Sequence, residues 1–267
     1  MPKDTRTAKK TRLSSLCEKM SFTVPTSWGE LKPEQLRYVI RLLWLYGEAP
    51  DWQERVKTAA FLHFCGIEVV SRTDQGWLCR EQKTGRTFLL DPSLLPSLLQ
   101  HLEWICQTEQ MTVRIGQVGE YKAFDFELME MPFGLYLEAE GSYQSYLAGK
   151  QQSALFQLAK SLYRVPEDEN PEELKDEVLL GAFLWFTAVK QLLGEEFPNF
   201  LKPAGDKPEP ITRESIIEGR RAQLRLLTKG DVTKEQYIKD KVDTWTALAE
   251  LDALAKEAEE IKRKYGK

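Results

Sequence analysis

The sequence is poor in the side chains that build metal centres and catalytic triads. Only two of its 267 residues are histidines, His63 and His101, and neither is followed by a metal-ligating residue three or four positions later. A zinc site or a nucleophilic triad needs several such groups at fixed geometry. Both histidines lie in apolar helical patterns, which are typical of packed or half-exposed helix residues. We therefore predict no catalytic residue, no bound metal and no cofactor, and expect a protein that is not an enzyme.

Cysteines and long apolar runs are scarce too. The four cysteines stand far apart without a C-x-x-C pair: Cys17, Cys65, Cys79 and Cys106. This scatter favours reduced thiols in a cytoplasm over a disulfide framework or a zinc site. The uncharged stretch 178–189 is shorter than the roughly 18–20 apolar residues of a membrane span. No apolar run follows the N-terminal charges, as a secretory signal would require. We expect no membrane partner.

The net charge of −4 argues against a protein built as a whole for nucleic acid. The exception is a basic N-terminal arm, residues 1–21, in which two acidic residues face six basic ones: Lys3, Arg6, Lys9, Lys10, Arg12 and Lys19. Such an arm can touch phosphates or anionic lipid. A solvated terminus is the more common role, so nucleic acid is not the partner we expect.

The most conspicuous feature that is present is the stretch 178–193. Apolar side chains fall on every face of its implied helix, and such a helix must be buried on all sides. Acidic residues suit the N-terminal end of a helix because of the macrodipole, and four precede or begin this one: Glu172, Glu173, Asp176 and Glu177. We predict that 178–193 is the central helix of a helical core domain spanning residues 22–201.

The rest of the core domain predicts a mainly α (α+β) fold. Apolar periodicity and capping signals predict further helices at 33–46, 51–66, 91–105, 119–129, 133–147 and 153–164. Between them, short β-rich segments separated by turns predict an antiparallel β-meander at about 67–90, with strands at 67–71, 77–82 and 86–90. One more strand is expected at 111–115. The fold is thus a multi-helix domain with a small meander and a long C-terminal helical extension.

A Pro-rich linker at 202–211 leads into a charged, helical segment at 212–267. One helix is expected at 212–229, and a second could run unbroken from 233 to 265. The second carries a coiled-coil seam with spacings of 4, 3, 4, 3 and 4: Ala247, Leu251, Leu254, Ala258, Ile261 and Tyr265. The partner-binding candidates are Leu251, Leu254, Ile261 and Tyr265, for a protein partner or self-association. The alternative is an intramolecular hairpin in which Ile216, Leu224 and Leu227 cover the seam.

Two other functions remain open. Asp74 with Glu81 and Lys83 resembles the carboxylate and E-x-K arrangement of metal-dependent nucleases, in which two carboxylates hold Mg²⁺. Glu81 and Lys83 would share one face of a strand. The second alternative is a nucleic-acid-associated factor that uses the basic arm together with Arg220, Arg221 and Arg225.

Several short motifs lie along the core domain: Ser27-Trp28-Gly29-Glu30-Leu31 with Pro33-Glu34-Gln35-Leu36, Gly116-Gln117-Val118-Gly119-Glu120-Tyr121, Leu158-Ala159 with Leu162-Tyr163-Arg164, and Ala182-Phe183-Leu184-Trp185-Phe186. Together they resemble a group of poorly characterised proteins from the tail region of tailed phages and prophages of Bacteroidetes. The resemblance covers residues 22–201. It implies a non-enzymatic tail-assembly protein, chaperone-like or structural, in the cytoplasm of the bacterial host or associated with the virion.

Overall fold

The computed structural model describes residues 22–201 and 211–265. Over these residues the protein is mainly helical with two small antiparallel sheets, which confirms the predicted fold class. The α-helices are α1 (Pro33–Tyr46), α2 (Trp52–Phe64), α3 (Leu95–Leu99), α4 (Phe133–Gly149), α5 (Gln152–Leu162), α6 (Glu177–Glu196), α7 (Arg213–Thr228), α8 (Glu235–Lys241) and α9 (Thr244–Tyr265). The strands are β1 (Ile67–Thr73), β2 (Gly76–Glu81) and β3 (Thr87–Leu90) in one sheet, and β4 (Gln117–Val118) and β5 (Tyr121–Lys122) in the other.

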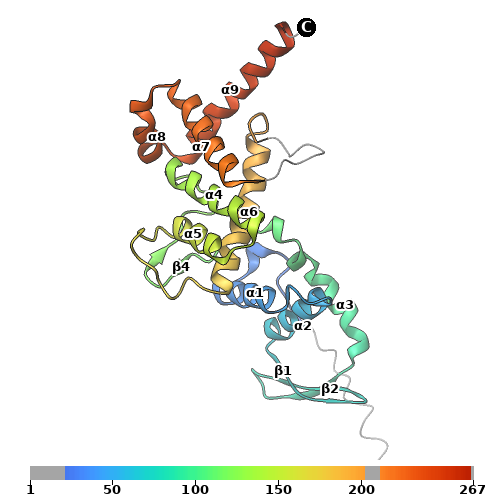
Figure 1. Ribbon diagram of the computed structural model, residues 1–267. Helices are drawn as coiled ribbons and strands as arrows, with labels where there is room; N and C mark the ends of the chain where they lie inside the picture. The colour runs from blue at the N-terminus through green and yellow to red at the C-terminus, as the bar shows by residue number, and fades with distance from the viewer. Residues whose placement is uncertain (1–21, 202–210, 266–267) are drawn as a thin grey trace, which may run out of the picture.

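Helix α6 lies at the centre of the fold, as its composition predicts (Figure 1). Gly181 lets it approach α1, because a Cβ at this position would lie 3.2 Å from side-chain carbons of both Ile40 and Ile115. On the α4 side, the ring of Phe186 packs near Tyr136 and Tyr143. By length and composition α6 could also cross a membrane, a property it shares with the core helices of soluble proteins. Here neighbouring helices cover much of its surface, including Ala182, Trp185, Phe186 and Val189.

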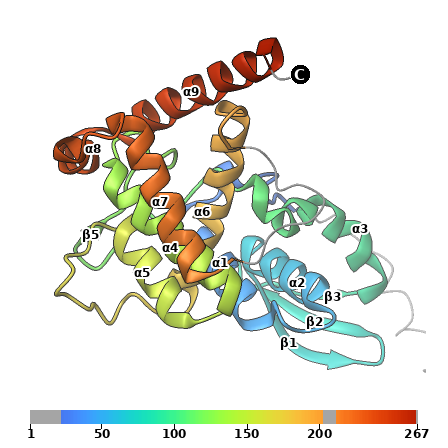
Figure 2. The same ribbon diagram turned by 45° about the horizontal axis from the view of Figure 1, so that its top comes forward.

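The three-stranded sheet is the predicted meander, with strand order β1-β2-β3. Gly66 has a φ of +62° directly after α2, a conformation that glycine adopts without strain and that turns the chain from the helix into β1. Cys79 of β2 lies opposite Phe88 of β3, and both Cys79 and Leu90 face the core. Figures 1 and 2 show an elongated molecule, with this sheet at one end and the C-terminal helices at the other.

The predicted helix at 119–129 is wrong. Gly119, with a φ of +55°, lies in the tight turn of the β4–β5 hairpin, and irregular backbone follows to residue 131. Several backbone groups of this segment bond to other elements: Phe124 N donates to the Leu162 carbonyl, and the Trp185 indole donates to the Phe126 carbonyl. The apolar spacing there serves tertiary packing and not a helix.

Two smaller expectations also fail. The helix at 91–105 is broken into 3₁₀ turns at Pro92–Leu94 and Gln100–Cys106 on either side of the short α3. Pro96 cannot donate a backbone hydrogen bond, and Leu102 has a non-helical φ of −114°, so the helix cannot run through. Residues 111–115 belong to no strand, although Met111 and Ile115 are buried.

The long helix expected at 233–265 is interrupted at residues 242–243. Val242 is extended, its carbonyl accepts from Phe133 N, and Asp243 forms a β-bridge with Pro132. The chain therefore forms a 3₁₀ turn (Val232–Lys234), α8 and α9 in place of one helix. Asp231 and not Thr233 caps the first of these, because its carboxylate accepts from Thr233 N at 3.1 Å.

Candidate interaction surface on the C-terminal helices

Helices α7, α8 and α9 pack onto α4. Thr244 donates to the Met131 carbonyl through both its backbone N and its Oγ1, at 2.9 and 2.8 Å. Helix α8 approaches α4 at Gly134, where a Cβ would lie only 2.9 Å from the Cβ of Lys239. Arg220 of α7 crosses α4 over Gly141, and its Nη2 donates to the Glu138 carbonyl. The segment at 211–265 is thus joined to the core by close packing.

Two aspartates fasten α9. Asp243 caps its first turn, since its carboxylate accepts from Thr246 N at 2.8 Å and from Thr246 Oγ1 at 2.7 Å. Asp252, one turn after the buried Leu248, accepts from Asn199 N and Nδ2, both at 2.7 Å, and from Phe200 N at 3.0 Å. These bonds hold the middle of α9 against the chain that leaves α6.

The predicted seam divides into two halves. Ala247 and Leu251 are each 1% exposed, because the protein's own core covers them. Leu254 is half-buried, whereas Ile261 is 59% and Tyr265 is 80% exposed. Residues 254–265, called the α9 tip below, stand clear of the core in Figures 1 and 2. Of the four predicted contact residues, Leu251 is therefore a core residue, and only the other three lie on the tip.

The hairpin alternative accounts for part of the seam. Helix α7 contacts α9, and Leu224 is buried while Leu227 is partly buried in the same cluster. Ile216 instead lines a cavity between α4 and α7. No residue of α7 reaches the tip strongly enough to bury Ile261 or Tyr265. The chain's own packing therefore covers the first part of the seam, and partner binding through the rest stays a prediction.

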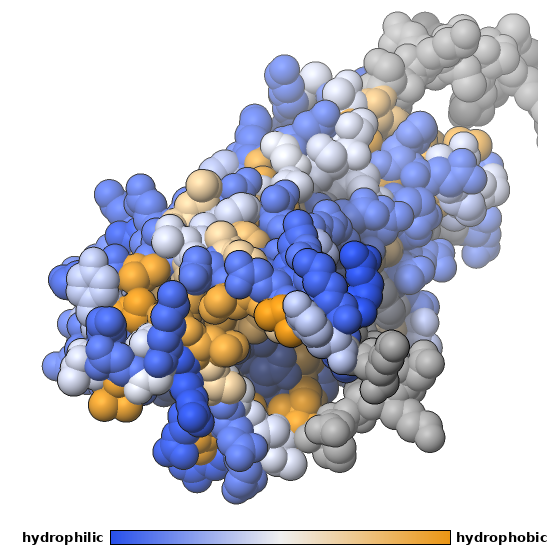
Figure 3. All heavy atoms as spheres, turned by 90° about the horizontal axis from the view of Figure 1, so that it is seen from above, coloured by the Kyte–Doolittle hydropathy of each residue, from blue (hydrophilic) through white to orange (hydrophobic). Residues whose placement is uncertain are grey.

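Exposed apolar side chains are dense on these helices. Seven of the fifteen large hydrophobic side chains exposed in the described residues lie within 211–265, although this segment is much the shorter part: Ile211, Ile217, Leu226, Val232, Tyr237, Ile261 and Tyr265. A second, smaller group lies on the outward face of the sheet, where Leu78 pairs with Leu89 near Val70. Seen from the end that carries the C-terminal helices, hydrophobic residues gather around a hollow in a mostly hydrophilic surface (Figure 3).

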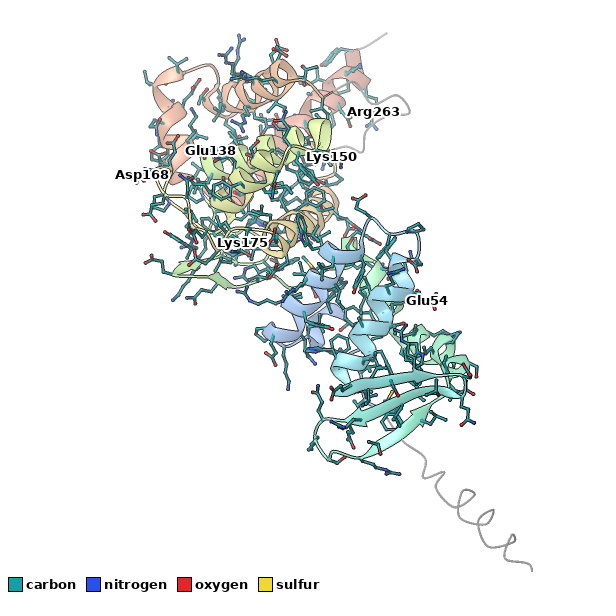
Figure 4. The ribbon with its side chains drawn as sticks, turned by 60° about the horizontal axis from the view of Figure 1, so that its bottom comes forward. Glu54, Glu138, Lys150, Asp168, Lys175 and Arg263 are labelled. Atoms are coloured by element: carbon teal, nitrogen blue, oxygen red, sulfur yellow. The ribbon has the colours of Figure 1, made fainter. Side chains whose placement is uncertain are left out.

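A cleft of about 840 Å³ lies between α4, α7 and α8. Its polar wall carries both signs of charge, from Glu138, Arg220, Arg221, Glu235, Lys239, Asp240 and Lys241. Burial raises the pKa of Glu138, which lies on α4 beneath the C-terminal helices in Figure 4. A smaller cavity of about 230 Å³ continues along α7, and there Arg220 Nε and Gln223 Oε1 are buried without a hydrogen-bond partner in the described chain. The interface of α7 with α4 is therefore polar and loosely filled.

The nuclease residues are not brought together. Asp74 lies in the turn between β1 and β2, whereas Glu81 ends β2 at the opposite end of that strand. Six strand residues at about 3.3 Å each separate them by far more than one metal ion can bridge. Glu81 instead accepts from Thr84 Oγ1 in the next turn. No group of three or more potential metal ligands occurs within residues 22–201 and 211–265.

The three arginines proposed for nucleic-acid binding, Arg220, Arg221 and Arg225, lie in different environments and do not form one basic surface. Arg220 is half-buried across α4, and burial lowers its pKa although Glu138 and Glu140 oppose this. Arg221 and Arg225 are exposed, but acidic side chains share the cleft that Arg221 lines. The basic arm, residues 1–21, lies outside the described residues.

A half-buried ion pair that the sequence did not suggest joins α4 to α6. Lys190 Nζ lies 3.1 Å from Glu140 Oε2, and the two side chains are 22% and 18% exposed. Burial lowers the pKa of Lys190, but Tyr136 and Glu140 outweigh this, so its pKa lies above the ordinary value. Burial raises the pKa of Tyr136 to about 12. Lys190 therefore stays charged at neutral pH and links α6 to Glu140 of α4.

Sequence reasoning also missed Asp243 and Asp252. Asp243 could have been found, because an aspartate three residues before Thr246 at the start of an apolar helical stripe is a capping pattern. Asp252 carries no such signal, since its partners Asn199 and Phe200 lie over fifty residues earlier in the chain.

Comparison of the chain with protein-family models, with curated proteins and with solved structures finds no match in any of the three. The motifs that carry the resemblance to phage tail-region proteins lie mostly in the core. Trp28 packs edge-on against Trp104 at 5.2 Å, and Trp185 is fully buried in α6. The motif at 116–121 forms the β4–β5 hairpin. These motifs specify packing and turns.

Acid is expected to loosen α9 before it unfolds the core. Burial raises the pKa of Asp243 and Asp252, but hydrogen bonds to each carboxylate outweigh this and hold both pKa values below the ordinary range. A carboxyl with a depressed folded pKa contributes stability above its unfolded pKa of about 3.9, and this is lost as the pH falls through the folded value. Hydrogen exchange of residues 244–265, corrected for intrinsic rates, should therefore lose protection between about pH 4 and pH 2.

The matched control is the double variant Asp243→Asn with Asp252→Asn, which removes both titrating groups. Its protection should be lower at neutral pH and should change little with acid. Equal loss of protection in wild type and double variant would show that other carboxylates control the docking of α9.

Proposed function

We propose that this protein is a non-enzymatic interaction and assembly protein that binds its partner, another protein or a second copy, through the α9 tip. The observation that carries the proposal is the continuation of a buried seam into solvent. Ile261 and Tyr265 extend the stripe of Ala247 and Leu251 and are 59% and 80% exposed. An apolar stripe at heptad spacing on a projecting helix is the form in which helices present themselves to a partner helix.

The distribution of exposed apolar residues also supports an interaction surface at the end of the molecule that carries the C-terminal helices. Scattered surface hydrophobics are ordinary, but a concentration of them marks interaction surfaces. Leu226 of α7, Val232 in the 3₁₀ turn before α8, and Tyr237 of α8 are 49%, 73% and 63% exposed. These side chains offer a second contact area for a partner that first engages the tip.

The proposed setting is phage tail assembly in the cytoplasm of a bacterial host, with a chaperone-like or structural role. The resemblance of the motifs in residues 22–201 to tail-region proteins supports this setting. A chaperone-like role suits a helical core that presents one projecting helix, because the core holds the helix in place while the tip remains free to bind.

Removal of the α9 tip should abolish association and leave the fold intact. A cut at Gly230, between α7 and α8, would also remove Thr244, Leu248 and Leu251, which are buried on the core. A chain ending at Lys256 keeps these residues and loses Ala258, Ile261 and Tyr265. Its free energy of unfolding should change by no more than about 0.5 kcal/mol, because the removed side chains are exposed.

Light scattering and co-purification from cells that carry the gene measure the loss of association. The full chain should show a larger assembly or a bound protein, and the chain ending at Lys256 should show neither. The double variant Ile261→Asp with Tyr265→Asp keeps the chain length and should behave like the truncated chain. Identical mass and identical bound proteins for all three chains would contradict the proposal.

A further inference from the structure

We infer that the partner of the α9 tip is the tip of a second copy of this chain, paired with it antiparallel. This inference rests on the proposed function and names its partner. The seam is buried at the beginning of α9 and exposed at its end. Ala247 and Leu251 are covered by the chain's own core, and Ile261 and Tyr265 are exposed. A partner helix can therefore occupy the seam only from about Leu254 onward.

This restriction decides the direction of pairing. In a parallel pair, residues 244–251 of the second copy would run along the positions at which Ala247 and Leu251 are already buried, and the two cores would collide there. In an antiparallel pair, the second copy approaches from the C-terminal end of α9, and its core lies beyond Tyr265. The free stretch is twelve residues, roughly 18 Å of helix at 1.5 Å per residue, and both copies contribute the same length.

The side chains of the tip are complementary to themselves in this arrangement. With Leu251 at heptad position a, Leu254 and Ile261 occupy d, and Ala258 and Tyr265 occupy a. An antiparallel pair places position a of one helix opposite d of the other. Ala258 then faces Ile261 of the second copy, so a small side chain meets a large one. Leu254 faces Tyr265 at each end of the contact.

The charges that flank the stripe agree with antiparallel pairing. Glu257 and Lys264 both occupy position g, and both are exposed. In an antiparallel pair, position g of one helix faces g of the other, so Glu257 lies opposite Lys264 of the second copy, twice in a symmetric dimer. In a parallel pair Glu257 would instead face Lys262 at position e, and Lys264 would face no residue of the partner helix.

The contact is small, so the dimer should be weak. Two helices of about three turns bury less than the roughly 1,200 Å² typical of stable complexes. We expect an association that depends on concentration in the micromolar to millimolar range, detectable by sedimentation velocity with the full chain over that range.

Charge exchange tests both the partner and the direction. Glu257→Lys and Lys264→Glu each replace two attractive pairs by two repulsive ones, so each variant alone should dimerise about tenfold more weakly. Mixing the two variants should restore association close to that of the wild type, because each new charge then meets its opposite. Arg263→Glu is the matched control. It makes the same charge change as Lys264→Glu in the same helical turn, but at position f on the far side of the helix from the seam. This variant should dimerise like the wild type (Figure 4 labels Arg263).

Each outcome decides the inference. A dimer that Glu257→Lys weakens and Lys264→Glu leaves unchanged is parallel and overturns it. A dimer insensitive to both variants uses another surface and also overturns it. A monomer at every concentration overturns the second copy as partner. If such a monomer still loses a bound protein when it is cut after Lys256, the proposed function survives with a different partner.

Discussion

The variant Trp185→Ala is expected to lose about 3–5 kcal/mol of its free energy of unfolding, the range for removal of a buried tryptophan side chain. Trp185 is fully buried, and its Nε1 donates to the Phe126 carbonyl at 2.8 Å. The Tyr163 ring lies edge-on at 6.2 Å, and the Arg114 guanidinium lies over the indole at 5.6 Å. The alanine variant would leave a large cavity at the centre of the fold and an unpaired carbonyl in the segment that follows the β4–β5 hairpin.

Urea unfolding measures this loss, and Trp44→Ala is the matched control. Trp44 lies on α1 and is 39% exposed, so its removal should cost much less, about 0.5–1 kcal/mol. A similar loss in both variants would mean that α6 is not the packing centre of the fold. A Trp185→Phe variant separates the contribution of the cavity from that of the lost hydrogen bond, because phenylalanine fills most of the space but cannot donate to the Phe126 carbonyl.

The variant Lys190→Met is expected to lose about 2–4 kcal/mol at neutral pH, somewhat less than the 3–5 kcal/mol for fully buried pairs because both side chains retain some exposure. The loss arises because the Glu140 carboxyl would be left inside the α4–α6 interface without its cation, with only Gln144 Nε2 as a hydrogen-bond donor, at 2.8 Å. Thermal or urea unfolding of wild type and variant at about pH 7 gives the difference.

Two further measurements identify the unpaired carboxylate as the cause. The double variant Glu140→Leu with Lys190→Met should recover most of the stability, since replacing a buried pair by apolar groups is often neutral. The loss in Lys190→Met should also shrink in acid, because a carboxyl left in the interface without its lysine is buried at lower cost in its neutral form. A loss that is independent of pH and persists in the double variant would assign the effect to packing alone.

Much of the fold follows from local patterns. The uniform apolarity of 178–193 predicts a buried helix, and α6 runs from Glu177 to Glu196. The alternation and turn residues of 67–90 predict the meander with boundaries correct within a few residues. These features are readable because each side chain's preference and its final environment agree over consecutive residues.

Other parts could not be read because distant residues decide them. The backbone of 122–131 bonds to Leu162, Trp185 and Trp245, and no local pattern names those partners. The break between α8 and α9 depends on Met131 and Phe133, which bond to Thr244 and Val242. Without those partners the charged, helix-favouring sequence of 233–265 would continue as one helix.

The amino-acid sequence by itself determined that this protein has a helical core around α6, a small meander and a heptad seam on its last helix. All three features follow from the spacing of apolar residues along the chain, which can be read from the sequence directly. Only the tertiary structure decided which part of the seam is free. Ala247 and Leu254 look alike as positions of one stripe, yet the first is covered because Thr244 and Asp252 fasten that half of α9 to residues 131 and 199–200. The tip has no such partner in the described chain, so Ile261 and Tyr265 of its apolar stripe stay exposed.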